Sequence, residues 1–376
     1  MKADPRQLWT WYSVLGTLNS QRSTRVMTDQ VEITTGSRLH FGPLFCGRTS
    51  GRRFGGVGLM IDRPRCRVSV RRSRGNGEPG ASATGALRRG GRGWSEAKPR
   101  QLEAPGLPFG PAPATLPAEF RPIVEKCIAG MTEIIGDVGP VCVEIHESIP
   151  RHRGLGSGTQ TALAIAQGIH VLHRGEAADA EALARITGRG LRSAIGIHGF
   201  QRGGFLIDAG KRHGDAVGAL AARCDVPDDW RFVLIAPRDA AGLSGQTERD
   251  AFARLPQMPA PTSAELCRIA LTELLPAVRG GDFPAFAAAL YDYGQIVGEY
   301  FAPVQGGCYA HPEMSRLTAE LRADGFAGVA QSSWGPTIAV AVRDAGTATE
   351  LADNVTNRGE KSCEIAGPRN GGATVS

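Results

Sequence analysis

The pattern of apolar positions changes sharply in the middle of the chain, between residues 141 and 172. Apolar and polar residues alternate through Val141–Ile145, which predicts a strand. After Thr159 the apolar residues Ile165, Ile169 and Leu172 return at helical spacing among many alanines, which predicts a helix. Between these two segments the chain contains alternating glycines, so it is expected to make a glycine-rich turn from a strand into a helix.

The glycine-rich turn has the composition of a loop that binds an anion. A turn that opens a helix leaves backbone N–H groups without partners and places the positive end of the helix dipole beside them. Glycine also lets the backbone approach a phosphate without interference from a Cβ atom. We therefore predict a phosphate-binding loop, with a glycine-rich corner that holds no ligand as the alternative. The predicted phosphate-binding residues are Arg151, Arg153, Gly154, Gly156, Ser157, Gly158 and Thr159.

The rest of the chain shows further strand and helix patterns, but strands and helices do not alternate regularly. This irregular order favours an α+β fold over a doubly wound parallel sheet. Strands are predicted at Gln30–Thr35, Cys66–Val70, Phe205–Ile207, Trp230–Ala236, Gly328–Gln331 and Thr337–Val342. Helices are predicted at Glu119–Ile135, Glu176–Thr187, Ser263–Val278, Phe283–Tyr300, His311–Ala323 and Ala345–Arg358.

Two domains with flexible additions are expected from these patterns. Residues 1–29 show no pattern and are expected to be a flexible leader, with Met27 as an alternative start. Residues 30–210 form the predicted first domain, interrupted at 71–117 by a segment whose composition predicts a disordered insertion. Residues 211–364 form the predicted second domain, and residues 365–376 are expected to be a loose tail.

The chain of 376 residues carries a net charge of +6 and has a pI of about 9.0, so the position of the excess positive charge matters. Much of this charge lies within residues 71–100, a segment rich in Gly, Arg, Pro and Ala. Few aromatic residues lie among the basic runs, whereas proteins that bind single-stranded nucleic acid stack bases on aromatic side chains. The charge therefore favours a small anionic substrate over a nucleic acid.

The cysteines and the apolar runs bear on the compartment. The eight cysteines include no CxxC pair and no zinc spacing, and Cys66, Cys127 and Cys142 lie among apolar residues, as buried thiols do. No apolar run approaches the length of a membrane span, and residues 1–26 show no convincing signal peptide. We expect a cytoplasmic protein with reduced thiols that does not interact with a membrane.

Five short motifs occur in order along the chain. They are Arg38-Leu-His-Phe-Gly42, Phe54-Gly-Gly-Val-Gly-Leu-Met-Ile-Asp62, Gly154-Leu-Gly-Ser-Gly-Thr-Gln160, Gly199-Phe-Gln-Arg-Gly-Gly204 and Gln331-Ser-Ser-Trp-Gly-Pro-Thr337. The third motif, in the glycine-rich turn, resembles the phosphate-binding motif of the GHMP kinase superfamily, and the fifth resembles the third, glycine-containing motif of that superfamily. Taken together the motifs are more similar to a branch that is not a kinase, the β-ribofuranosylaminobenzene 5′-phosphate synthase family, over residues 31–358.

The resemblance implies a two-lobed GHMP-kinase-like fold with a mixed sheet and helices. It implies condensation of phosphoribosyl pyrophosphate with 4-aminobenzoate, loss of CO₂ and pyrophosphate, and a role as the first step of methanopterin biosynthesis. It also implies a need for Mg²⁺, whose ligands remain open, and a homodimer. An ATP-dependent kinase of the same superfamily and a non-catalytic phosphate binder are the alternatives. The kinases commonly carry an Asp in their middle region, but Ser193–Gly204 contains no carboxylate.

The resemblance also suggests roles for residues in the motifs. An arginine fork matches a carboxylate bidentately, so Arg38, Arg53 and Arg202 are candidates to hold the carboxylate of the aromatic acid. His40 and His198 are candidates to orient the ring substituent or to exchange a proton. The alternatives are surface arginines and hydrogen-bonded core histidines. The residues predicted to contact the ring are Gln331, Ser332 and Trp334, although a core tryptophan is also compatible with the hairpin.

Overall fold

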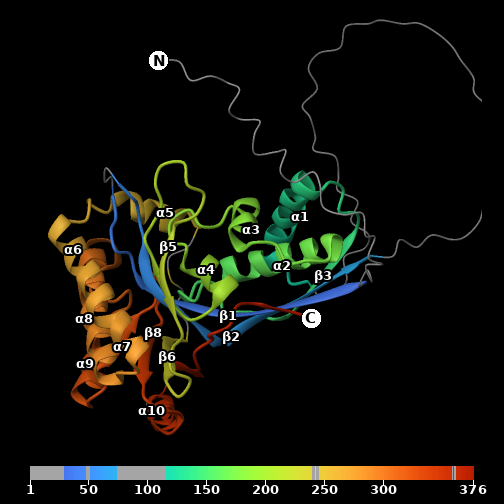
Figure 1. The fold of residues 1–376 in the computed structure, drawn as a ribbon. Helices are drawn as coiled ribbons and strands as arrows, with labels where there is room; N and C mark the ends of the chain where they lie inside the picture. The colour runs from blue at the N-terminus through green and yellow to red at the C-terminus, as the bar shows by residue number, and fades with distance from the viewer. Residues whose placement is uncertain are drawn as a thin grey trace, which may run out of the picture.

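The computed structural model describes residues 29–47, 51–73, 116–238, 242, 245–357, 359 and 361–376, which form two β-sheets with helices packed against each (Figure 1). This arrangement confirms the predicted α+β class. Every strand pair found between described residues is antiparallel, where a mixed sheet was expected. The predicted leader and insertion lie almost entirely outside the described residues.

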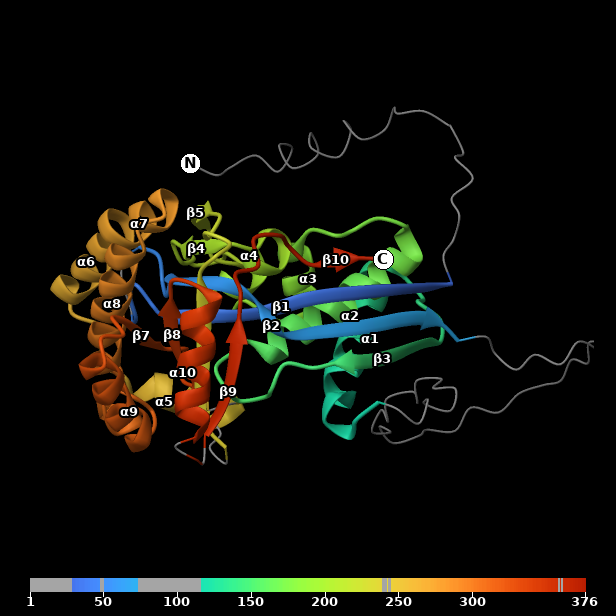
Figure 2. The ribbon, with the colours of Figure 1, turned by 90° about the horizontal axis from the view of Figure 1, so that it is seen from below.

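The first sheet is built on two long strands that pair over most of their length. Its strand order is β10-β1-β2-β4-β5, and β3 pairs with the other end of β2. Helices cover one face of this sheet, and the view from below looks onto the opposite face (Figures 1 and 2). The strands are β1 (Gln30–Gly42), β2 (Gly56–Arg72), β3 (Val141–Glu147), β4 (Phe205–Asp208), β5 (Leu220–Cys224) and β10 (Thr374–Val375). The helices are α1 (Arg121–Ile135), α2 (Ser157–Arg174), α3 (Ala180–Thr187) and α4 (Ile195–Arg202), with a 3₁₀ turn at Ala118–Phe120 before α1.

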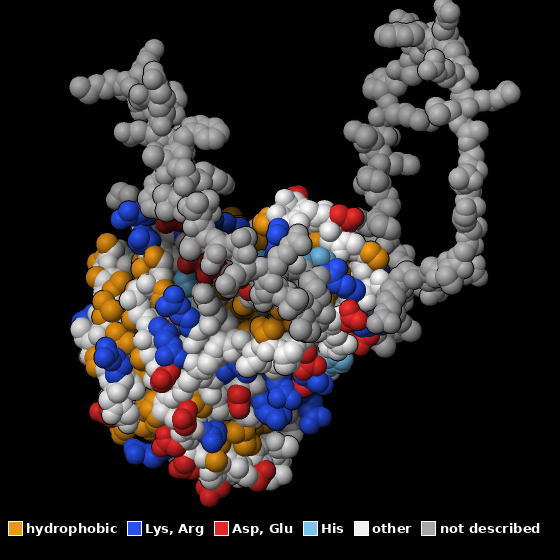
Figure 3. Space-filling model, turned by 45° about the vertical axis from the view of Figure 1, so that its right-hand side comes forward, with side chains coloured by type: hydrophobic (Ala, Val, Ile, Leu, Met, Phe, Trp, Pro, Cys, Tyr) orange, Lys and Arg blue, Asp and Glu red, His pale blue; other side chains and the backbone are white. Residues whose placement is uncertain are grey.

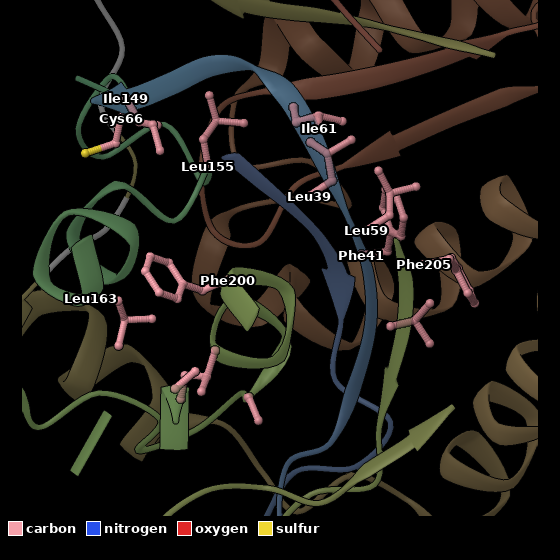
Figure 4. Packing of buried hydrophobic residues seen from close by; sticks show 14 of the residues in the cluster. Leu39, Phe41, Leu59, Ile61, Cys66, Ile149, Leu155, Leu163, Phe200 and Phe205 are labelled. Carbon is pink, nitrogen blue, oxygen red and sulfur yellow. The ribbon is translucent and has the colours of Figure 1, made fainter. Parts of the chain in front are cut away.

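The core beneath these helices explains why the glycine-rich turn is well positioned. Figure 4 shows buried side chains of β1 and β2, among them Leu39 and Leu59, in the same cluster as Phe200 of α4 and Leu163 of α2. Leu155, between two glycines of the turn, is buried in this cluster as well. Burying a side chain of this size contributes roughly 1.5–3 kcal/mol. The apolar residue within the turn therefore anchors the turn to the sheet.

The second sheet is covered on both faces. Its strand order is β7-β8-β6-β9, and β6 reads as a continuous apolar run, as expected for a strand buried on both sides. One face packs against α8 in the main core, and the other packs against α9 and α10 in a separate cluster. The strands are β6 (Arg231–Pro237), β7 (Gly328–Gln331), β8 (Ile338–Val342) and β9 (Lys361–Ala366). The helices are α5 (Gly245–Arg254), α6 (Ala260–Arg268), α7 (Leu275–Gly280), α8 (Phe283–Gln305), α9 (Pro312–Ala323) and α10 (Ala345–Asn357), with a π-helical turn at Ile269–Leu274 between α6 and α7.

The C-terminal tail is ordered, which corrects the expectation of a loose tail at 365–376. After β9 in the second sheet the chain crosses to the edge of the first sheet, where β10 pairs with β1 (Figure 2). The backbone N–H of Arg369 donates to Met60 O (2.9 Å), and Ser376 and Glu32 exchange backbone hydrogen bonds of 3.0 and 2.7 Å. These contacts are made by the backbone, so the polar, glycine-rich sequence of the tail carries no pattern that predicts them.

The boundary between the two sheets lies further along the chain than the predicted domain boundary. The predicted boundary was placed at residues 210 and 211, but β5 pairs with β4 and completes the first sheet. The first sheet therefore extends to Cys224, and the second begins at Arg231. The short strand β5 was missed because its five residues show no alternation of apolar and polar positions.

The charged side chains and the cysteines of the described residues are distributed as in an ordinary globular protein. On the face drawn in Figure 3, basic and acidic side chains are interspersed. All eight cysteines are free thiols, and Cys66, Cys127 and Cys142 are buried as predicted. None of the helices in the described part of the chain is long and apolar enough to cross a membrane.

Candidate active site

A cleft of about 570 Å³ lies where the glycine-rich turn of the first domain meets the 331–337 segment of the second. Its lining is basic, and among the described residues that line it none carries a carboxylate. Such a lining favours a ligand with several negative charges. The lining residues are Arg38, Ile123, Arg151, His152, Gly154, Leu155, Gly156, Ser157, Gly158, Thr159, Arg189, Arg192, Ser333, Trp334 and Gly335.

The N-terminus of α2 forms one wall of the cleft. Gly156 is its N-cap residue and adopts a left-handed conformation, with φ of 78° and ψ of 18°. No side chain caps this end of the helix. The first N–H groups of a helix have no partners within the helix, and the helix dipole adds a partial positive charge there. The predicted phosphate-binding residues Ser157, Gly158 and Thr159 therefore line the cleft at a position suited to an anion.

Arg38 is held directly against the glycine-rich turn. Its backbone N–H donates to Leu155 O (3.1 Å), and its Nη1 donates to Gly154 O (3.3 Å). A Cβ atom at position 156 would lie 2.6 Å from Arg38 Cγ, so only glycine leaves room for this arginine. Arg38, predicted to hold a carboxylate, thus lies beside the predicted phosphate-binding loop.

Two further arginines of the cleft, Arg189 and Arg192, were missed by the sequence reasoning. They follow α3 in a segment that contains Gly188 and Gly190, both with positive φ. Arg189 lies beside the loop, because a Cβ atom at Gly158 would be 3.3 Å from its Nη1. Burial lowers the pKa of Arg189 from its ordinary high value. The signal that could have found them is two arginines three residues apart in a short loop, the first of them flanked by glycines.

Asp208 positions the segment that carries Arg192. Its carboxylate is buried at the end of β4 and accepts hydrogen bonds from Ala194 N (2.6 Å) and Gly210 N (2.7 Å). Burial raises the pKa of this carboxyl group, and the two backbone donors oppose that shift. Ala194 is two residues after Arg192, so the carboxylate fixes the start of α4 and the arginine just before it.

The 331–337 segment of the second domain is hydrogen-bonded to the glycine-rich turn of the first domain. The Ser332 hydroxyl donates to Gly154 O (2.8 Å) and accepts from the backbone N–H of His40 (3.2 Å). The next residue, Ser333, donates its backbone N–H to His40 O (2.7 Å). Ser332, predicted to contact the ring, therefore joins three segments and does not itself line the cleft.

A small apolar cavity of about 30 Å³, here called the annex, opens beside the cleft and shares Arg192, Ser333 and Trp334 with it. The Trp334 ring packs against Phe252 and Phe301, with centroid distances of 4.8 and 4.6 Å. The guanidinium carbon of Arg192 lies 4.4 Å from the Phe252 ring centroid. The annex is lined by His40, Pro43, Phe54, Gly55, Arg192, Ser193, Phe252, Phe301, Ser333 and Trp334.

Backbone strain among the described residues is concentrated at these two cavities. Three residues other than glycine have positive φ: Phe54 at 68°, His152 at 57° and Ser333 at 57°. All three line the cleft or the annex. Such conformations are costly for a residue with a side chain and cluster at functional sites.

His40 is buried and uncharged. Burial, together with the positive charges of Arg38 and Arg192, lowers its pKa well below the ordinary value of 6.5. The folded protein therefore resists protonation of His40, whereas the unfolded chain takes up the proton below pH 6.5. The contribution of His40 to stability is complete above pH 6.5 and is lost as the pH falls toward the pKa of the folded state.

Replacing His40 by Gln is expected to weaken the loss of stability in acid. The wild-type free energy of unfolding should fall more steeply between pH 7 and 5 than that of His40→Gln, by at most about 1.4 kcal/mol per pH unit. Urea unfolding at both pH values measures the difference. The exposed His213, changed to Gln, is the control and should follow the wild type. Parallel curves for wild type and His40→Gln would contradict the account.

Three predicted catalytic residues lie away from the cleft. Arg53 is exposed, and its backbone pairs with Lys211. His198 is a buried residue of α4, and its Nε2 donates to Gly218 O (2.8 Å). Arg202 is exposed at the end of α4. None of the three lines the cleft or the annex.

Four other predicted residues differ in their positions. Arg151 lines the cleft, and its Nη1 donates to Glu119 O (3.1 Å). Arg153 points to β6 instead and donates to the carbonyls of Pro237 and Arg238. Gln331, predicted to contact the ring, accepts a hydrogen bond from Ala310 N (2.6 Å) and donates one to Ser333 O (2.9 Å). It therefore supports the 331–337 segment. Trp334, by contrast, lines both cavities.

The donors of the cleft do not fit a magnesium ion held by the protein. Mg²⁺ prefers oxygen ligands and is usually bound through one or two carboxylates together with substrate phosphates. The described residues of the lining supply arginines, hydroxyls and backbone groups, but no carboxylate. Within the described part of the chain, no group of three His, Cys, Asp or Glu residues is placed to hold a metal ion.

Family models match both halves of the chain. The GHMP kinases N terminal domain matches residues 122–204, and the GHMP kinases C terminal domain matches residues 274–361. Two curated relatives, from Methanothermobacter thermautotrophicus and Methanocaldococcus jannaschii, are each 28% identical to this chain. The alignments cover 83% and 81% of this chain, respectively, and 88% of each relative. Both relatives are named beta-ribofuranosylphenol 5'-phosphate synthase.

Solved structures share the fold at low sequence identity. The homoserine kinase from Cytophaga hutchinsonii has a TM-score of 0.58 and is 15% identical, with 96% of this chain and 100% of that chain covered. The mevalonate diphosphate decarboxylase from Staphylococcus aureus has a TM-score of 0.59 and is 11% identical, with 93% and 98% covered. These similarities agree with the two-lobed architecture described above and carry no information on the substrate.

Proposed function

We propose that this chain, both halves of which match GHMP kinase family models, is a phosphoribosyl-transferring synthase. The reaction would join phosphoribosyl pyrophosphate to a para-substituted benzoate, with release of pyrophosphate and CO₂. The observation that carries the proposal is the cleft itself, which places four arginines and a helix N-terminus around a space whose described lining has no carboxylate. Cations stabilise a departing pyrophosphate, whereas a kinase would need a base for its hydroxyl substrate.

The proposed chemistry needs no proton from the protein. The bond between ribose C1 and the pyrophosphate oxygen breaks, and its electron pair leaves with the pyrophosphate. The ring carbon that bears the carboxylate forms the new bond to ribose C1. The bond from that carbon to the carboxylate then breaks, its electron pair restores the aromatic ring, and CO₂ departs. Stabilising the leaving group is thus the main task of the protein, and Arg38, Arg189 and the α2 N-terminus are placed to do it.

The acceptor is proposed as a benzoate with an amino or hydroxyl group at the para position. The resemblance of the motifs implies 4-aminobenzoate. The name of the curated relatives refers instead to a ribofuranosylphenol, which corresponds to a hydroxyl at that position. Either group donates electrons to the ring carbon that attacks ribose, so both suit the chemistry. A place at the start of methanopterin biosynthesis follows from this proposal and from the resemblance alone.

Magnesium is proposed only as a companion of the substrate phosphates. The described lining offers no carboxylate to hold it, and none of the steps above requires a metal held by the protein. The homodimer and the cytoplasmic location stay predictions from the sequence.

A direct comparison of donors tests the proposed function. Purified protein is incubated with phosphoribosyl pyrophosphate, Mg²⁺ and either 4-aminobenzoate or 4-hydroxybenzoate, and pyrophosphate release is measured. Parallel reactions contain ATP with homoserine or mevalonate. We expect pyrophosphate release that depends on the benzoate, and no phosphate transfer from ATP. Phosphorylation of an alcohol from ATP, without reaction of phosphoribosyl pyrophosphate, would favour the kinase and contradict the proposal.

A further inference from the structure

We propose that the annex binds the para substituent of the aromatic acceptor, and that His40 and Trp334 select a hydroxyl over an amino group there. The inference rests on the proposed function and deepens it, because it assigns the residues that recognise the para substituent of the acceptor. It starts from two buried polar atoms that have no hydrogen-bond partner among the described residues.

The size of the annex limits what it can hold. A cavity needs roughly 10–15 Å³ for one water molecule, so the annex of about 30 Å³ holds a small polar group and not an aromatic ring. The ring must then lie at the junction with the cleft, where Trp334 and Arg192 belong to both linings. A para substituent in the annex directs the opposite end of the ring, with its carboxylate, into the basic cleft where ribose C1 would be.

The two polar atoms beside the annex lack partners among the described residues. His40 is 7% exposed and Trp334 is 4% exposed, and neither His40 Nε2 nor Trp334 Nε1 makes a hydrogen bond. A buried donor or acceptor without a partner is costly, so proteins seldom keep one without a reason. His40 Nε2 lies next to Gly56, since a Cβ atom there would be 2.8 Å away, and the adjacent Gly55 lines the annex.

Hydrogen bonds between the two domains join the segments that carry these two side chains. Ser333, which precedes Trp334, donates its backbone N–H to His40 O at 2.7 Å. The backbone N–H of His40 is bound in turn by Ser332 Oγ at 3.2 Å. The two side chains therefore approach the annex from different domains and are fixed relative to each other by these two hydrogen bonds.

Their chemistry distinguishes a hydroxyl from an amine. The indole N–H of Trp334 can only donate, whereas the uncharged imidazole of His40 can accept. A phenolic hydroxyl accepts from one and donates to the other, so both buried atoms gain partners. An aromatic amine offers two donors and a delocalised lone pair, so the Trp334 N–H would remain without an acceptor. When His40 Nε2 accepts a hydrogen bond from the para hydroxyl, it also favours electron release from that oxygen into the ring while the bond to ribose forms.

The ratio of kcat/KM for 4-hydroxybenzoate to that for 4-aminobenzoate tests this assignment. We expect the wild type to prefer 4-hydroxybenzoate by about 10- to 100-fold, the cost of leaving one buried donor without a partner. Trp334→Phe keeps an aromatic ring but removes the N–H, so the preference should fall to near unity. Trp230→Phe is the matched control, because Trp230 packs against Phe283 and Phe286 in the core, and its ratio should match the wild type.

A second variant and a binding measurement keep the assignment distinct from the proposed function. His40→Phe should lower kcat/KM for both acceptors by tenfold or more, yet leave the binding of unsubstituted benzoate, which has no para group, unaffected. Calorimetric binding of the two acceptors in the presence of pyrophosphate gives the same preference without turnover. If the acceptors bind with the expected preference but are not turned over, the proposed reaction is contradicted and the role of the annex is not. Equal binding of both acceptors, or a Trp334→Phe ratio equal to the wild-type ratio, would overturn the role of the annex.

Discussion

Replacing Arg38 by Met is expected to lower kcat/KM for phosphoribosyl transfer by about 10²–10³-fold, the usual cost of removing one donor that stabilises developing charge. Arg38 lines the cleft and lies directly over the glycine-rich turn, where pyrophosphate would leave. Methionine preserves the unbranched stem that packs over Gly156, so the loss should arise from the missing charge and not from the fold. Steady-state kinetics with phosphoribosyl pyrophosphate as the varied substrate measures the effect.

Arg53→Met is the control for this prediction. Arg53 was also a candidate from the sequence, but it is exposed and lies outside both cavities. We expect kcat/KM of Arg53→Met to stay within about twofold of the wild type, since substitutions of exposed residues outside a functional site have little effect. Equal activity of Arg38→Met and Arg53→Met, or a larger loss in Arg53→Met, would contradict the placement of the site.

Gly156→Ala is expected to remove most activity at a modest cost in stability. The left-handed conformation costs a residue with a side chain roughly 1–2 kcal/mol. The new Cβ atom would in addition lie 2.6 Å from Arg38 Cγ, so the arginine must leave its position over the loop. We predict a loss of at least about 100-fold in kcat/KM, as for loss of the Arg38 charge. Kinetics and urea unfolding of the same preparation separate the two effects.

Gly281→Ala isolates the backbone cost. Gly281 has φ of 68° and ψ of 21°, close to the values of Gly156, and ends a helix far from the cleft. A Cβ atom there would meet Pro227 Cγ at only 4.0 Å, an ordinary contact. Gly281→Ala should lose similar stability but retain full activity. If Gly156→Ala were as active as Gly281→Ala, the fit of Arg38 against the loop would have no functional importance.

The central element of the site could be predicted from the sequence because its signals are local. The strand, the alternating glycines and the helical spacing that begins near Ser157 all lie within one short segment. The pairing of this turn with Arg38 was not visible in the same way. It depends on hydrogen bonds from the backbone and the side chain of Arg38 to a segment more than a hundred residues away, and only the resemblance of separate motifs brought the two segments together.

The predicted site residues that lie outside the cleft have a common physical feature. His198 and Gln331 stand in conspicuous motifs, yet their polar atoms satisfy neighbouring backbone groups inside the fold. A motif predicts that a residue is needed and does not say whether it faces a ligand or the core. Arg192 and Phe252, which shape the annex, lie outside those motifs, because the cavity forms only when the two domains meet.

The fold was predictable to the level of its elements and less so at its edges. Long periodic segments such as α8 were found, while the crossing of the C-terminal tail to the first sheet was not. Backbone hydrogen bonds to strands of the first domain and the side chains of Arg369 and Asn370 hold the tail, and neither kind of contact produces a periodic pattern in the sequence.

The fate of the carboxylate carbon tests the central claim most directly. The wild-type protein is incubated with phosphoribosyl pyrophosphate, Mg²⁺ and 4-hydroxybenzoate or 4-aminobenzoate labelled with ¹³C at the carboxyl group. The account predicts one labelled CO₂ and one pyrophosphate for each ribosylated arene, with no label left in that product. A ribosylated product that retains the labelled carboxylate, or no reaction of phosphoribosyl pyrophosphate with either benzoate, would contradict it.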